Sequence, residues 1–229
     1  MNVLTSAFWG EGPTDERFLP KLIQRVLEDL LLACARGEWE VLEPIVLQSR
    51  ENRFADALAD VARQSKGLTL LFVHTDADAQ DEAEKAWPHK LAPGLSRLRE
   101  LREGDACQNV VAVIPVTKIE NWKLADLEAL EHILGGRLDW QHLGLNLGAA
   151  QREQAARSKE LLAEVIRTAN QRRHRRIQLS PADLDEPLAR RMDLSRLAPY
   201  TSFQRFLGRL KTTLTGLNIL TEDCTADLR

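Results

Sequence analysis

The stretch LTLLFVHTDAD, residues 68–78, decides the fold and raises the first question about function. Its first half is a continuous apolar run, which is typical of a strand buried on both faces of a parallel sheet. Two carboxylates, Asp76 and Asp78, follow this run directly, and Asp81 comes soon after them. In open α/β sheets, ligands bind beyond the carboxyl ends of the strands. The stretch therefore predicts a buried parallel strand with an acidic site at its end.

Three more segments have the apolar character of buried or half-buried strands. They are residues 3–11, 39–48 and 110–117. Segments with a helical spacing of apolar residues separate the four strands, and they cover residues 15–37, 52–66 and 79–102. This alternation predicts an α/β fold with a central parallel sheet of about four strands flanked by helices.

The second half of the chain is dominated by helical patterns. They cover residues 121–134, 150–172, 180–192, 193–199 and 200–214. We therefore expect an α/β domain over residues 1–130 and a helical annex over residues 131–229. The annex is expected to pack on the edge of the sheet or beside the acidic site.

The composition is that of a folded chain: 44% of the 229 residues are apolar, which is enough for a core. The sequence contains neither an apolar run of about 18 residues nor an export signal, so we expect no membrane insertion and a cytoplasmic location. The cysteines Cys34, Cys107 and Cys224 are far apart and lack the spacing of a zinc site. They fit a reducing compartment, and cysteine chemistry is not the expected basis of function.

The net charge of −3 argues against a protein that coats nucleic acid through bulk electrostatics. A local basic patch is still available in QRRHRR, residues 171–176, at the end of a predicted helix. The nucleic-acid-binding candidates in this patch are Arg172, Arg173, Arg175 and Arg176. The alternative is a solvated helix end whose cations complement the helix dipole.

Acidic residues follow three of the four predicted strands. The first strand ends at Glu11 in EGPTDE, where Gly12 and Pro13 turn the chain into a helix that carries Asp15 in its first turn. The fourth strand runs into TKIEN, which contains Lys118 and Glu120. Right-handed crossovers return each strand to the same edge, so these groups are expected to meet there.

Crowded carboxylates repel one another unless a cation lies among them. Oxygen ligands select hard ions, so the pattern predicts a site for Mg²⁺ or Mn²⁺. For Asp76 and Asp78 taken by themselves, the alternative is a solvated loop in which an aspartate caps the next helix.

These motifs resemble the TOPRIM domain of topoisomerases, primases and OLD nucleases. The likeness consists of a strand that ends in Glu-Gly with an acidic residue four positions after the Glu, and a later strand that ends in Asp-x-Asp. Within that superfamily the chain is most similar to small stand-alone proteins of prokaryotes, which also show an E-x-W-x-x-A-D segment. Here that segment is residues 120–126, and the resemblance covers residues 1–130.

The resemblance implies a role for each site residue. Glu11 would be a metal ligand or general acid/base, and Asp76 and Asp78 would be metal ligands. Asp15 would be a second-site ligand, as in the nuclease branch of the superfamily. If two ions bind, one would activate water and the other would offset charge on the leaving oxygen.

The fourth strand would supply the later acidic and basic residues of the site, Glu120 and Lys118. Lys118 would bind the scissile phosphate, with a plain surface cation as its alternative.

The implied function is a metal-dependent nuclease acting on DNA. Its relatives are often encoded beside an ABC-type ATPase, so the chain would be the effector subunit of a two-component anti-phage defence system, and a homo-oligomer is also open. The main alternative is a non-catalytic partner or regulatory module of an ATPase complex. A manganese-dependent glycosyltransferase ranks last, and RNA remains open as a substrate.

Three single residues have bland interpretations that we prefer. His74 is expected to be a packed or hydrogen-bonded histidine rather than a ligand. Trp122 is expected to anchor its helix against the sheet. Tyr200, the only tyrosine, is the sole candidate for a covalent nucleophile, but its context is a helix start and we discount that role.

Overall fold

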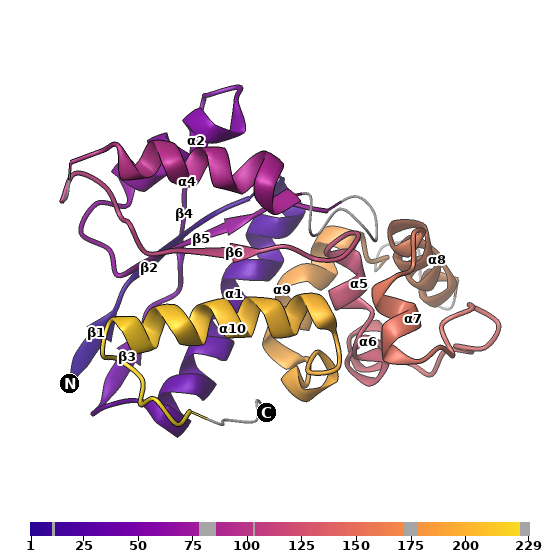
Figure 1. Ribbon diagram of the computed structural model, residues 1–229. Helices are drawn as coiled ribbons and strands as arrows, with labels where there is room; N and C mark the ends of the chain where they lie inside the picture. Colours follow the sequence, from indigo (N-terminus) through magenta and orange to yellow (C-terminus); the bar gives the residue numbers. More distant parts are fainter. Residues whose placement is uncertain (11, 78–85, 103, 172–177, 225–229) are drawn as a thin grey trace.

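The computed structural model describes residues 1–10, 12–77, 86–102, 104–171 and 178–224 (Figure 1). Within them, the strands are β1 (Asn2–Leu4), β2 (Ser6–Trp9), β3 (Trp39–Val41), β4 (Ile45–Val46), β5 (Leu70–His74) and β6 (Val110–Val113). The helices of the first half are α1 (Pro13–Cys34), α2 (Phe54–Gln64), the π-helical turn η1 (Trp87–Leu91) and α4 (Ala92–Arg99). The second half contains α5 (Glu120–Lys123), α6 (Leu127–Leu134), α7 (Ala149–Glu153), α8 (Ser158–Asn170), α9 (Pro181–Arg191), the 3-10 turn η3 (Leu194–Arg196) and α10 (Thr201–Gly216).

The central sheet has the strand order β4-β2-β5-β6, and all of its pairings are parallel. β1 and β3 form a separate two-stranded parallel sheet. The prediction of an α/β fold with a parallel sheet is therefore confirmed. Each of the first two predicted strands is divided into two short ones, so the sheet strands are shorter than their apolar runs.

The sheet is covered on both faces, and its residues alternate between two cores. Phe8, Phe72 and Val113 pack with α1 and α10 on one face. Ala7 and Val73 pack with α2 and α4 on the other. Figure 1 shows these helix pairs on opposite sides of the strands. A strand with both faces buried is largely apolar, which is the signal in residues 70–73.

The C-terminal helices are joined to the first half by the same core. α10 packs against the edge strand β6, and α9 packs along α1. Trp122 of α5 is fully buried, as expected for an anchor, but its ring packs against Phe203 of α10 at 5.2 Å between ring centroids. The expected anchoring on the sheet itself remains a prediction. The division into two domains at residue 130 remains a prediction.

Two helices that the sequence predicts as continuous are divided. Residues 121–134 form α5 and α6, because the Asp126 carboxylate accepts a hydrogen bond from the Ala129 amide at 2.9 Å and starts a new helix there. Residues 150–172 contain α7 and α8, which are separated by residues 154–157.

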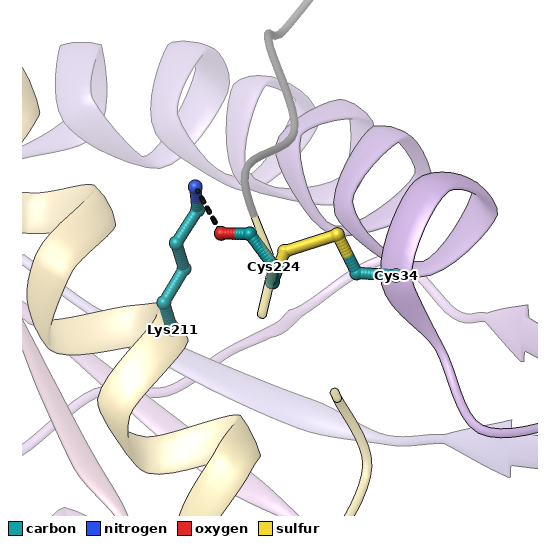
Figure 2. The surroundings of a disulfide bond; sticks show 3 residues. All are labelled: Cys34, Lys211 and Cys224. Atoms are coloured by element: carbon teal, nitrogen blue, oxygen red, sulfur yellow. Dashed lines mark hydrogen bonds between the residues drawn. A yellow bond between two sulfur atoms is a disulfide. The ribbon is translucent and has the colours of Figure 1, made fainter. Parts of the chain in front are cut away.

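A disulfide joins Cys34, the last residue of α1, to Cys224 near the end of the chain (Figure 2). The Thr221 amide donates to the Cys34 carbonyl at 3.0 Å, and Lys211 donates to the Cys224 carbonyl at 3.4 Å, so the segment is also held by hydrogen bonds. Cys107 is buried and free. The interpretation of the cysteines as residues of a reducing compartment did not anticipate this bond, because pairing depends on proximity across 190 residues.

No helix in the described ranges is long and apolar enough to cross a membrane.

Candidate functional site

The candidate site lies where β2 and β5 end side by side at the carboxyl edge of the sheet. The register pairs Trp9 with Val73, so the residues after both strands emerge at the same level. α1 starts four residues after β2, and its first turn contains Asp15. Asp76 follows β5 by two positions. The topology therefore brings together two acidic residues that are far apart in sequence.

Glycine allows the tight passage from β2 to α1. A Cβ atom on Gly10 would lie 2.9 Å from the Phe8 ring and 3.4 Å from the Asp15 Cβ. At the following turn, the Asp15 amide donates to the Gly12 carbonyl at 3.1 Å. A side chain at this position would require the Phe8 ring to shift, so Gly10 favours the close approach of α1 to the strand end.

His74 links the two aspartates. Its side chain is 1% exposed, and its Nε2 lies 3.6 Å from the Asp15 Oδ2 and 3.6 Å from the Asp76 Oδ1. Its Nδ1 lies 3.0 Å from the Val113 carbonyl oxygen of β6. The expected packing and hydrogen bonding of His74 are confirmed, whereas the expectation that it is not a ligand remains a prediction. The sequence does not show that the second ring nitrogen faces both carboxylates.

Lys90 brings a cation to the same edge, and sequence analysis missed it. Its Nζ donates to the Thr75 hydroxyl at 2.9 Å and to the Asp76 carbonyl at 3.3 Å. It comes from η1, which is 14 residues further along the chain than Asp76. Nothing in the WPHKL segment distinguishes this lysine from a surface lysine.

Six of the other predicted site residues cannot be compared with the structure. Glu11, Asp78 and the four arginines Arg172, Arg173, Arg175 and Arg176 lie outside the described residues.

Lys118 precedes α5 and Glu120 is its first residue, both half-buried. In the described part of the chain, no hydrogen bond or ion pair joins either side chain to Asp15, His74 or Asp76. Their roles in the site remain predictions.

A divalent ion fits this donor set in its chemistry. Two carboxylates and an unprotonated imidazole nitrogen are ordinary ligands of Mn²⁺ and related ions. Across residues 1–10, 12–77, 86–102, 104–171 and 178–224, no three His, Cys, Asp or Glu side chains form a ready-made metal group. Each aspartate thus lies near His74, but the three side chains do not surround one common position.

Tyr200 is remote from any nucleophilic role. Its side chain is 0% exposed, and burial raises the pKa of its phenol. The discounting of Tyr200 as a covalent nucleophile is therefore supported by its enclosure.

A hollow of about 700 Å³ opens between the C-terminal half of α1 and β3, lined among others by Glu28, Leu32 and Trp39. β3 belongs to the two-stranded sheet with β1, and the C-terminal half of α1 is the part of that helix farthest from Asp15. The hollow is therefore separate from the acidic edge.

Comparison of the chain with family models, with curated proteins and with solved structures finds no match.

Proposed function

We propose that this chain is a divalent-metal-dependent nuclease that cleaves phosphodiester bonds of DNA. One observation carries the proposal: Asp15 and Asp76, from separate strand ends, both lie 3.6 Å from the buried His74 nitrogen. The carboxyl edge of a parallel sheet is the ordinary position for a ligand. Paired carboxylates at such an edge are the ligands that Mg²⁺ and Mn²⁺ prefer.

Asp15 and Asp76 would hold the ion, together with Glu11 and Asp78, which the sequence predicts as ligands and which lie outside the described residues. When bound, the ion would supply Lewis-acid stabilisation of the charge that develops on a phosphoryl group. Lys90 lies against Thr75 and the Asp76 carbonyl, so it is positioned to bind a phosphate oxygen of the substrate. This role is the one that the sequence assigned to Lys118.

The wider assignment rests on the sequence resemblance of residues 1–130. Under this assignment the chain is a TOPRIM nuclease that acts as the effector of an ABC-type ATPase in anti-phage defence. The α/β fold with its parallel sheet is compatible with this assignment.

The proposal is tested by incubating supercoiled plasmid with the purified chain and MnCl₂ or MgCl₂. Asp15→Asn and Asp76→Asn should each slow nicking on the order of a hundredfold, the usual loss when one electrostatic stabiliser of a transition state is removed. Asp105→Asn is the matched control. Asp105 is exposed, pairs with Lys66 and precedes β6, at the opposite edge of the sheet.

Equal nicking by all three variants and the unaltered chain would remove the site from the chemistry. If the unaltered chain neither cleaves DNA nor binds Mn²⁺, the non-catalytic partner module becomes the better assignment.

A further inference from the structure

His74 is a fully enclosed side chain whose Nε2 atom lies between two carboxylates. The ring is 1% exposed, which excludes bulk water as a partner. Within the described residues, Nε2 has no hydrogen-bond partner. A buried polar atom without a partner costs free energy, so its direction toward Asp15 and Asp76 requires an explanation.

The other ring nitrogen fixes the tautomer. The Val113 carbonyl oxygen can only accept a hydrogen bond, and it lies 3.0 Å from the His74 Nδ1. Nδ1 therefore carries a proton, so Nε2 is the nitrogen that has a lone pair when the ring holds a single proton. A histidine that donates through one nitrogen to a backbone carbonyl and presents the other is the usual arrangement of a metal ligand.

The lone pair of Nε2 points at negative charge on both sides. A cation bound at Nε2, either a proton or a metal ion, would make that arrangement favourable. A protonated imidazole would make charge-assisted hydrogen bonds of about 2.7 to 2.9 Å. The observed separations are both 3.6 Å, which is too long for a hydrogen bond.

Metal ligation predicts longer separations. Two donors that each lie about 2.1 Å from one ion are about 3.0 to 3.4 Å apart in octahedral or tetrahedral geometry. The observed 3.6 Å is closer to this range than to the hydrogen-bonded one. Because no three His, Cys, Asp or Glu side chains in the described ranges form a ready-made metal group, an ion would have to draw the Asp15 and Asp76 carboxylates together around Nε2.

We propose that His74 Nε2 is a ligand of the divalent ion held by Asp15 and Asp76, and that this nitrogen makes the site favour Mn²⁺ over Mg²⁺. The inference rests on the proposed metal centre and adds a residue and a metal preference to it. An imidazole donor adds more affinity for transition metals than for Mg²⁺, which prefers oxygen ligands.

The test uses Mn²⁺ alone, the full chain and no substrate. The unaltered chain is loaded with one equivalent of MnCl₂, and electron spin echo envelope modulation is recorded. Direct coordination predicts modulation from a histidine nitrogen. The modulation should change when histidine carries the heavier nitrogen isotope. This measurement needs no variant, so it stands even if a substituted protein misfolds.

Binding of Mn²⁺ and Mg²⁺ is then measured by calorimetry for His74→Asn. An asparagine amide can replace Nδ1 as the donor to Val113, but it leaves nothing in the place of Nε2. We expect the Kd for Mn²⁺ to rise about tenfold or more, and the preference for Mn²⁺ over Mg²⁺ to shrink. His142→Asn is the matched control, because His142 is exposed in the loop between α6 and α7.

The outcomes separate this inference from the proposed function. Nitrogen modulation that is lost in His74→Asn and kept in His142→Asn supports ligation. Binding of Mn²⁺ that is abolished by Asp76→Asn but shows no nitrogen modulation overturns the role of His74 and leaves the metal centre standing. If the unaltered chain binds no Mn²⁺, both proposals are overturned together.

Discussion

Asp185 is a carboxylate with a 1% exposed side chain, and two cations hold it in the interior. Lys123 Nζ lies 2.6 Å from one oxygen, and Arg17 Nε lies 3.2 Å from the other. Lys123 is itself buried, and its ammonium lies 5.2 Å from the centroid of the Phe18 ring. Because Arg17 follows Asp15 by two positions, this group of charges fixes the start of α1, which carries the candidate ligand.

Replacing either partner of the buried Lys123–Asp185 ion pair should lower the free energy of unfolding, but by different amounts. Asp185→Ala leaves Lys123 buried without a counterion and should lower the free energy of unfolding by about 3 to 5 kcal/mol. Lys123→Met should cost less, because Asp185 keeps Arg17. Urea unfolding followed by circular dichroism measures both.

Glu186→Ala is the control, since Glu186 pairs with Arg190 at the surface and should contribute less than about 1 kcal/mol. An Asp185→Ala protein as stable as the control would show that the pair is not needed.

Helix ends in the second half are stabilised by side chains from other elements. Glu153 of α7 accepts hydrogen bonds from the Thr201 and Ser202 amides at 2.9 and 2.7 Å, at the start of α10. Arg25 of α1 donates to the Ala189 and Met192 carbonyls at 2.8 and 2.7 Å, at the end of α9. The unpaired groups of helix termini are thus satisfied by tertiary contacts.

Loss of the Glu153 carboxylate should loosen the start of α10. Glu153→Ala leaves the Thr201 amide, the buried Ser202 amide and the Ser202 hydroxyl without their acceptor, which should cost about 1 to 3 kcal/mol of stability. Glu153→Gln keeps one acceptor oxygen and should cost less. Hydrogen exchange of the α10 amides reports the effect locally.

Gln151→Ala provides the comparison, since Gln151 accepts from the Gly148 amide at the exposed start of α7. Faster exchange in α10 only in the Glu153 variants is the expected result, and equal exchange in all three would contradict it.

At the scale of the whole molecule, a shared core and a disulfide join the first half of the chain to its C-terminal segment. One hydrophobic core contains residues of β2, α1, α6, α9 and α10, and the Cys34–Cys224 disulfide joins the end of α1 to the last described segment. Closing a loop of 190 residues restricts the unfolded chain far more than the folded one.

Reduction should therefore lower the stability by about 2 to 4 kcal/mol. Thermal unfolding with and without dithiothreitol, with thiols counted in parallel, measures this effect. Cys224→Ser should unfold at one temperature in both conditions, while Cys107→Ala should keep the sensitivity to reductant. An unchanged Tm for the fully reduced protein would show that hydrogen bonds and packing alone hold the C-terminal segment.

Local sequence patterns determined the alternation of strands and helices, the parallel sheet and the position of Asp15 and Asp76 at one edge. These features follow from periodicity and from the direction of parallel strands, both of which are encoded within short windows. The burial of Trp122 and of His74 follows from the same apolar patterns.

Only the tertiary structure decided which distant side chains meet. Lys90 reaches the site from η1, Asp185 pairs with Lys123 across 62 residues, and Cys34 pairs with Cys224 across 190. Each of these contacts depends on the direction of a side chain after its element has packed, and no local pattern records that direction. The same reason applies to His74, whose sequence position predicts burial but not the two carboxylates that its Nε2 faces.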